Sequence, residues 1–356
     1  MVTVQLTTNP GFEDLVIDEL RARIAADGLV LSRVELRPDG LAGHVSVDID
    51  ATWHDLRPAL LSLRSAHRAV RSVAQFILDG PRPLDQIKRM VSEVVPKISE
   101  LDDIERSFRV TSSRTGTHSF TSEDVQRVAG AGVRAVARHP VSLKAFDVEI
   151  RCDVRKRVCK IGVQLGPLFQ RRRGPYTQRT SLRSNVAWAL LQLARPDKPP
   201  ERLLDPFCGA GTVLLEAGLR WPRVQLAGVD RLEAAAQGTR DNLLRADLID
   251  RADVRWADAR ALLEQWPSET FDTVVCNPPF GKRLGRGLDL ARFYGDVLHS
   301  LAAVCRPDAR LVMVAQRRHA FNRALHASAR WSSRHVRVFE LGGLYVGAFV
   351  LEQTRA

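Results

Sequence analysis

The sequence predicts a two-part protein, in which an α+β region precedes a doubly wound, mostly parallel α/β sheet with an antiparallel C-terminal edge. Three observations predict this fold class. After residue 181, short apolar runs alternate with segments of helical periodicity, the pattern of a parallel sheet with crossover helices. Before residue 166 the pattern is less regular and includes strand pairs separated by turns. The last two apolar runs flank Gly342-Gly343, so they should pair as an antiparallel edge.

The first part divides into two α+β stretches. In residues 1–52, a strand (2–6), a turn at Asn9-Pro10-Gly11, a helix (12–24) and two strands (30–36 and 44–49) are expected. In residues 53–166, a helix at 84–98, a strand at 107–112, a helix from Ser122 and a hairpin of 145–152 with 157–164 are expected.

A basic linker, residues 167–180, leads into the α/β part at 181–356. Ser181 could cap a helix that runs to residue 193. Strands are expected at 202–205, 224–230, 254–257, 273–276, 311–315, 335–341 and 345–351, and helices at 212–219, 233–247 and 289–305.

Charge is concentrated in one segment of this 356-residue chain, whose net charge is +12. Residues 106–183 hold 17 Lys/Arg and 5 Asp/Glu, so the surplus of this segment equals that of the whole protein. A localised basic surface fits a phosphate backbone or an anionic membrane. The sequence has no run of 18 apolar residues and no signal-peptide pattern, and its five cysteines form no disulfide framework. We expect a reduced, cytoplasmic protein.

A glycine-containing loop follows the first strand of the α/β part, where ligands bind in open parallel sheets. Gly209 and Gly211 leave room for a ligand to approach the backbone. A dinucleotide fingerprint would need a third glycine where Leu214 stands, and no phosphate-loop lysine follows. The loop reads Asp205-Pro206-Phe207-Cys208-Gly209-Ala210-Gly211-Thr212.

Acidic and amide side chains end the next three strands. Asp230 can accept hydrogen bonds from both ribose hydroxyls, or cap the following helix. Asp258 can accept from an adenine amino group, although a loop aspartate is often only a cap. The fourth strand ends in Asn277-Pro278-Pro279-Phe280. There the Asn277 amide oxygen and the Pro278 carbonyl could hold both hydrogens of an exocyclic amino group, with Phe280 against the base.

Together these motifs resemble those of Rossmann-like amino-methyltransferases. The resemblance implies S-adenosylmethionine as cofactor, with Asp205, Gly209 and Gly211 on its methionine side. It implies that Asp230 holds the ribose, that Asp258 and Ala259 meet the adenine, and that Asn277, Pro278 and Phe280 take the target base. The cofactor site should also include Arg183, Phe207, Thr212 and Asn277.

The first part resembles known domains too. Residues 108–130, with Gly116-Thr117-His118-Ser119-Phe120, are similar to the THUMP RNA-binding domain, and residues 8–15 resemble the ferredoxin-like unit before it. The family resembled most is that of THUMP-containing tRNA guanine-N2 methyltransferases that modify position six of the acceptor stem. Ribosomal-RNA guanine-N2 and N6-adenine methyltransferases on RNA or DNA share similar motifs, and a non-catalytic RNA-binding module is a further alternative.

The remaining candidates concern RNA contacts, cysteines and metals. Six arginines are expected to bind RNA phosphates, although those of the linker could instead be a solvated hinge: Arg109, Arg114, Arg171, Arg172, Arg173 and Arg179. Cys208 or Cys276 as a nucleophile would indicate carbon methylation, but buried packing is favoured because neither has a basic neighbour in sequence. No metal site is expected.

Overall fold

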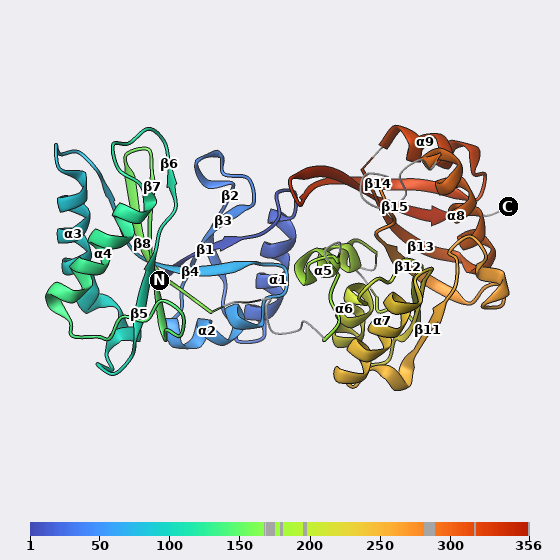
Figure 1. The fold of residues 1–356 in the computed structure, drawn as a ribbon, viewed down its shortest axis with the longest axis horizontal. Helices are drawn as coiled ribbons and strands as arrows, with labels where there is room; N and C mark the ends of the chain where they lie inside the picture. Colours follow the sequence, from blue (N-terminus) through green and yellow to red (C-terminus); the bar gives the residue numbers. More distant parts are fainter. Residues whose placement is uncertain are drawn as a thin grey trace. The chain divides into compact units, whose positions relative to one another are not determined.

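The chain is described here from a computed structural model, which describes residues 1–166, 168, 175–178, 181–194, 198–280, 289–316 and 318–354. It forms two compact units. The first comprises Met1–Thr8 and Val16–Leu168, and the second comprises Asn9–Leu15 and Phe169–Ala356. Each is built around one sheet (Figure 1). Among the described residues, no helix has both the length and the apolar character needed to span a bilayer.

A mixed sheet in the order β2-β3-β1-β4-β8-β7-β5, with β6 beside β7, forms the first unit. The hairpin predicted from residues 145–152 and 157–164 is confirmed, because β7 and β8 pair antiparallel around Lys156. The strands are β1 (Val2–Thr7), β2 (Leu31–Leu36), β3 (His44–Ile49), β4 (Arg68–Ile77), β5 (Phe108–Thr111), β6 (Arg114–Thr115), β7 (Val148–Arg155) and β8 (Val158–Gln164). The helices are α1 (Glu13–Ala25), α2 (Trp53–Ser62), α3 (Pro83–Val94) and α4 (Ser122–Val136).

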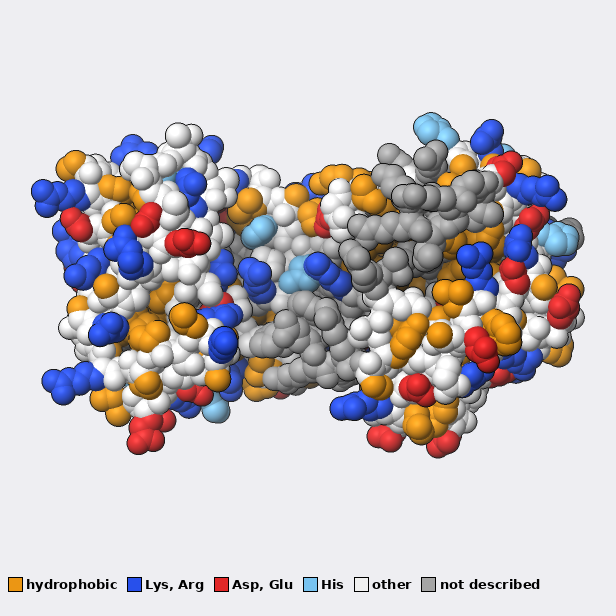
Figure 2. Space-filling view, in the orientation of Figure 1, with side chains coloured by type: hydrophobic (Ala, Val, Ile, Leu, Met, Phe, Trp, Pro, Cys, Tyr) orange, Lys and Arg blue, Asp and Glu red, His pale blue; other side chains and the backbone are white. Residues whose placement is uncertain are grey.

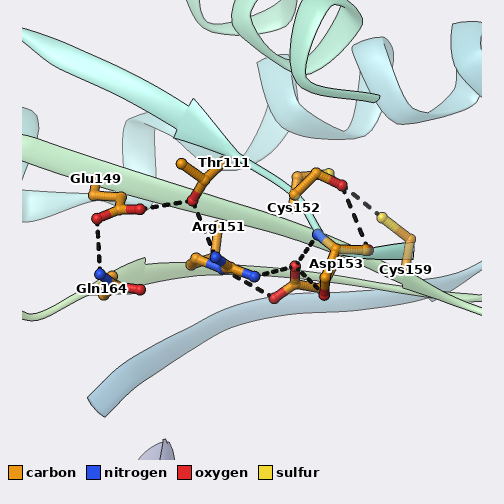
Figure 3. A network of polar contacts seen from close by, with 9 residues as sticks. Thr111, Glu149, Arg151, Cys152, Asp153, Cys159 and Gln164 are labelled. Carbon is orange, nitrogen blue, oxygen red and sulfur yellow. Dashed lines mark hydrogen bonds and ion pairs between the residues drawn. The ribbon is translucent and has the colours of Figure 1, made fainter. Parts of the chain in front are cut away.

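Alternation along β7 separates an apolar face from a polar one. Ile150 and Cys152 pack in a core with α3 and α4, whereas Glu149 lies on the opposite face. Glu149 accepts hydrogen bonds from Thr111 Oγ1 (2.7 Å), Gln164 Nε2 (2.7 Å) and Arg109 Nη2 (3.0 Å). Part of this network, which ties β5, β7 and β8 together, is seen in Figure 3.

The second unit has the predicted doubly wound sheet. Its order is β11-β10-β9-β12-β13-β15-β14, parallel from β11 to β13 and antiparallel from β13 to β14. The strands are β9 (Arg202–Asp205), β10 (Gln225–Asp230), β11 (Ala252–Trp256), β12 (Phe271–Cys276), β13 (Cys305–Ala315), β14 (Trp331–Leu341) and β15 (Leu344–Gln353).

Helices cover both faces of this sheet (Figure 1). One apolar core contains side chains of α5 (Ser184–Ala194), α6 (Thr212–Arg220) and α7 (Glu233–Arg245). The other contains side chains of α8 (Leu290–Val304) and α9 (Arg318–Ala327). Strand β12 lies between the two cores, and each of its six residues is buried. This explains its nearly continuous apolar sequence.

Residues 9–15 belong to the second unit although they lie near the start of the chain. The Phe12 ring stacks on that of Phe339 at 4.6 Å, and Asn9 Nδ2 donates to the Glu340 carbonyl at 2.8 Å. Gly11 is required at its position, because a Cβ there would lie 2.3 Å from the Val338 carbonyl oxygen. The turn at residues 9–11 therefore packs against β14. Sequence periodicity alone could not predict this long-range contact.

One helix start differs from the prediction. Ser181 does not cap α5, which begins at Ser184. The Ser181 hydroxyl instead accepts the backbone N–H of Gln178 at 3.2 Å, so it closes a turn in the chain that leads into the helix.

Candidate active site

The glycine-containing loop joins β9 to α6 at the carboxyl end of the sheet. Gly209 and Gly211 have φ values of +56° and +76°, in the left-handed region that favours glycine. A Cβ at Gly211 would lie 2.9 Å from Thr239 Cγ2 on α7. Thr239 Oγ1 also donates to the Gly209 carbonyl at 2.9 Å. Thr239 of helix α7 therefore packs directly against the loop backbone at Gly209 and Gly211 and fixes its conformation.

Two carboxylates, those of Asp205 and Asp230, accept hydrogen bonds from backbone N–H groups of the loop. Asp205 is 2% exposed, and its Oδ1 accepts the Phe207 N–H at 3.0 Å. Burial raises the pKa of Asp205 to about 7, and the charge of Asp230 adds to this effect. Asp230 accepts the N–H groups of Gly209 (3.0 Å) and Leu232 (2.9 Å). It therefore orders the chain on both sides of the expected ribose position, while Leu232 occupies the N-cap position of α7.

The third acid lies at the end of β11 and is engaged by a neighbour. Asp258 accepts from Arg260 Nε at 3.0 Å and from its Nη2 at 2.7 Å. This interaction lowers the pKa of the Asp258 carboxyl. Ala259 is buried in the core beside α8. A contact of these residues with adenine stays a prediction, and Arg260 would have to share the carboxylate.

The Asn277-Pro278-Pro279-Phe280 motif follows β12 directly. The Asn277 Oδ1 atom is buried and has no hydrogen-bond partner among the described residues. Pro278 is buried, and Phe280 packs against the core beside α5, α6 and α7. A buried acceptor without a donor costs free energy, so the Asn277 oxygen is suited to accept a hydrogen bond from a bound ligand.

Strand register brings these side chains to one face of the sheet. Gly228 of β10 is level with Asp205 of β9. Leu204 of β9 is level with Val274 of β12. Paired residues of parallel strands point the same way and neighbours along a strand alternate. Asp230, Asp205 and Asn277 therefore share one face, at the carboxyl ends of three adjacent strands.

A further segment of this site was missed by the sequence analysis: residues 175–178 lie on α7 beside the glycine loop. Asn242 accepts the Tyr176 N–H (3.0 Å), while its Nδ2 donates to the carbonyls of Tyr176 and Ala210 (both 2.9 Å). The Tyr176 ring lies over Gly238, where a Cβ would be 2.2 Å from the ring. Asn242 thus ties this segment to the loop.

Gln178 completes this arrangement. Its Nε2 donates to the Tyr176 hydroxyl at 2.7 Å, and its Oε1 lies 3.4 Å from the position of a Cβ on Gly209. The signals in the sequence were the helical glycine at 238 and Asn242 one turn later on α7, both of which are unexplained by helix formation.

The two cysteines near the site are buried thiols. Burial raises the pKa of both Cys208 and Cys276, and the carboxylate of Asp205 raises each further. A thiolate nucleophile needs a lowered pKa. The geometry therefore disfavours carbon methylation through either residue.

The predicted RNA-binding arginines have different surroundings. Arg109 pairs with Glu149, and its guanidinium lies 3.8 Å from the centroid of the Phe146 ring. Arg114 Nη1 contacts the Gly116 carbonyl (2.8 Å) and His118 Nδ1 (3.1 Å). Arg171, Arg172, Arg173 and Arg179 lie outside the described residues. Of the other predicted cofactor residues, Thr212 begins α6, Phe207 packs on the α8 core and Arg183 directly precedes α5.

The first unit has a pocket of its own, of about 410 Å³. Its walls include His118, Lys156 and Arg157, together with Gly116 and Thr117. On the face drawn in Figure 2, Lys and Arg side chains are spread widely over this unit. Among the residues that the structure describes, no group of three or more His, Cys, Asp or Glu could hold a metal ion.

A doubly wound sheet with a glycine loop, strand-end acids and Asn-Pro-Pro-Phe defines a Rossmann-like methyltransferase. Residues 171–346 match the family model of the RMKL-like methyltransferase domain, and residues 81–164 match that of the THUMP domain. The second match confirms the resemblance inferred for the basic half of the chain.

Similarity to characterised relatives extends over nearly the whole chain. It is 34% identical to the tRNA (guanine(6)-N2)-methyltransferase of Thermus thermophilus, across 98% of this chain and 99% of that protein. The crystal structure of TrmN from Thermus thermophilus superposes with a TM-score of 0.80 at 33% identity, covering 99% of this chain and 100% of that one. The U6 snRNA (guanine-N(2))-methyltransferase THUMPD2 of Bos taurus is 28% identical over 68% of this chain and 47% of its own length. The chain belongs to the family of THUMP-domain methyltransferases that includes the Thermus enzyme.

Proposed function

We propose that the protein transfers a methyl group from S-adenosylmethionine to the exocyclic N2 of a guanine in the acceptor stem of tRNA. The observation that carries this proposal is the buried Oδ1 of Asn277, which has no hydrogen-bond partner among the described residues and lies on the same sheet face as Asp205 and Asp230. The named activity of the Thermus relative supports N2 of guanine as the target atom.

The residues at the glycine loop fit the cofactor. The left-handed backbone at Gly209 and Gly211 forms a tight turn at the carboxyl end of β9, and Asp205 offers a carboxylate that ionises near neutral pH. When bound, S-adenosylmethionine supplies a methyl group already activated on a sulfonium. We assign its binding to Arg183, Asp205, Phe207, Gly209, Gly211, Thr212, Asp230, Asp258 and Ala259. Asn277 borders this site, but its affinity-determining contacts are with the base and not with the cofactor.

Positioning is the main task of the catalytic loop. Asn277 Oδ1 and the Pro278 carbonyl each accept one hydrogen of the amino group, which directs the nitrogen lone pair out of the plane of those two bonds. Phe280 offers an aromatic face to a base flipped out of its helix. No strong base is required, because the amino nitrogen can lose its proton during or after methyl transfer.

RNA binding is assigned to the first unit. Its basic surface, the pocket beside His118, Lys156 and Arg157, and its THUMP domain support this assignment. We retain Arg109, Arg114 and the four linker arginines as proposed phosphate contacts. The name of the Bos taurus relative shows that related enzymes act on other RNAs, so ribosomal RNA and N6 of adenine remain the alternatives. The five free, buried cysteines suit the reducing cytoplasm, where we place this activity.

Unmodified bulk tRNA is the first substrate to test. Methyl transfer by the wild type, followed by digestion and nucleoside mass spectrometry, should yield N2-methylguanosine. Asn277→Ala should remove this product while S-adenosylmethionine affinity, measured by calorimetry, stays within about twofold. Methylation of ribosomal RNA or DNA instead of tRNA would contradict the substrate, and loss of cofactor affinity in Asn277→Ala would contradict the role of that residue.

A further inference from the structure

A second side-chain amide oxygen that has no partner among the described residues lies at the same edge of the sheet. Gln316 is the first residue after β13, and its Oε1 atom is buried without a hydrogen-bond partner in the part of the chain that the structure describes. The proposed function assigns no role to Gln316. Buried side-chain oxygens are usually satisfied in folded proteins, and this one lies beside the proposed catalytic loop, where a bound base could supply the donor.

Strand register places Gln316 diagonally from Asn277, on the neighbouring strand. Strands β12 and β13 are adjacent and parallel, with Cys276 level with Met313. Val314 is therefore level with Asn277, and both share the face on which Val275 and Val314 pack in one core. By the same alternation, Gln316 belongs to this face, one strand over from Asn277 and two residues further toward the carboxyl edge. Along the edge, the order is Asp230, Asp205, Asn277 and Gln316.

Two neighbouring acceptors match one edge of guanine better than that of adenine. Guanine presents its N2 amino group next to a protonated N1, so two donors stand side by side. Adenine presents its N6 amino group next to an unprotonated N1, which would oppose a second acceptor. Enzymes that flip a base read it through this edge.

We propose that Gln316 is the specificity-determining residue that selects guanine, its Oε1 accepting the N1 hydrogen while Asn277 holds N2. This inference rests on the proposed function and adds to it the means of choosing the base. A site built to accept a hydrogen bond discriminates against a substrate that lacks the donor, because the buried acceptor then stays unpaired.

The position that the wild type methylates is first mapped in a tRNA transcript. The test then uses transcripts that carry either guanine or 2-aminopurine at that position. 2-Aminopurine keeps the amino group at C2, but its N1 bears no hydrogen. Four full-length proteins are compared by kcat/KM on both RNAs: wild type, Gln316→Met, Gln316→Glu and Gln353→Met. Methionine has a similar length and no strong acceptor, and glutamate has acceptors only. Gln353 is a matched control, since its Oε1 is also buried and without a partner among the described residues, but it lies at the opposite end of the sheet.

The wild type should prefer guanine by about 10- to 100-fold, the range expected for one unsatisfied buried group. Gln316→Met should bring the ratio close to one by losing activity on guanine, while Gln316→Glu and Gln353→Met should keep a clear preference. A wild type that uses both RNAs equally overturns the inference without any variant, even if Gln316→Met fails to fold. An unchanged ratio in Gln316→Met also overturns it, while N2-methylguanosine formation leaves the proposed function standing. N6-methyladenosine as the wild-type product would overturn both.

Discussion

Asp205 offers a direct test of the cofactor side of the site through pH. Its carboxyl group is buried, and its pKa is raised to about 7 by burial first and by the charge of Asp230 second, against the lowering effect of the Phe207 N–H. S-adenosylmethionine carries a positive sulfonium, so it should bind the ionised form of Asp205 more tightly. Since an acid loses its proton as pH rises, affinity for the cofactor should increase from pH 6 to pH 8.

The size of this effect follows from the pKa. With a pKa of about 7, the ionised fraction of Asp205 is about 0.1 at pH 6 and about 0.9 at pH 8. If binding requires the ionised form, the apparent affinity changes about tenfold, which corresponds to about 1.4 kcal/mol. Asp205→Asn cannot ionise, so this contribution should disappear.

Isothermal titration calorimetry of S-adenosylmethionine at pH 6, 7 and 8 measures the effect in both proteins. The quantity compared is the difference between the two pH profiles, because the amino group of the ligand itself titrates identically in both experiments. Asp205→Asn should bind more weakly than wild type at pH 8 and similarly at pH 6. Parallel profiles in the two proteins would refute an ionisable, ligand-facing Asp205.

The same titration predicts a stability change: the folded pKa lies above that of the unfolded chain, so the contribution of Asp205 is present below about pH 4 and is lost as pH rises through about 7. Asp205→Asn should reduce this pH dependence of unfolding, which is worth about 4 kcal/mol at most. Gly238→Ala should lower cofactor affinity about tenfold, because its methyl group would displace Tyr176, whereas Gly295→Ala, with open space around its Cβ, should leave calorimetric affinity unchanged. Glu149→Ala should reduce the free energy of unfolding in urea by about 1–3 kcal/mol, since it leaves the donors of Thr111, Gln164 and the partly exposed Arg109 without their acceptor. The exposed Glu93→Ala is the control, and equal losses in the two variants would contradict the importance of the network.

The parts of the site that the sequence predicted are those carried by strand ends. Asp205, Asp230 and Asn277 each follow an apolar run, and the carboxyl ends of parallel strands meet at one edge. Local periodicity was therefore enough to bring together residues 72 positions apart in sequence. The same reasoning located the antiparallel hairpin of β14 and β15 from Gly342-Gly343 and the flanking alternation.

Contacts made by irregular segments that pack on distant elements could not be predicted, because such segments have no periodic sequence pattern. Tyr176 and Gln178 lie in a segment without helix or strand, and their place on α7 depends on the two-way hydrogen bonds of Asn242. Helix α2 was missed because Pro58 within it reads as a helix breaker, although Thr52 caps its start by accepting the Asp55 N–H. Gln316 was missed because a single glutamine after a strand has no motif, and only the unpartnered oxygen singles it out.

The choice of amides at the ends of β12 and β13 follows from the charge at the ends of β9 and β10. Asp230 already raises the pKa of Asp205, which stands at about 7. A carboxylate in place of Asn277, on the next strand and the same face, would raise that pKa further and leave Asp205 largely protonated at neutral pH. The site would then lose the negative charge that we propose to face the cofactor. Neutral amide oxygens at Asn277 and Gln316 accept hydrogen bonds from a base without this cost, so acceptor capacity for the base and ionised charge for the cofactor can coexist along one edge.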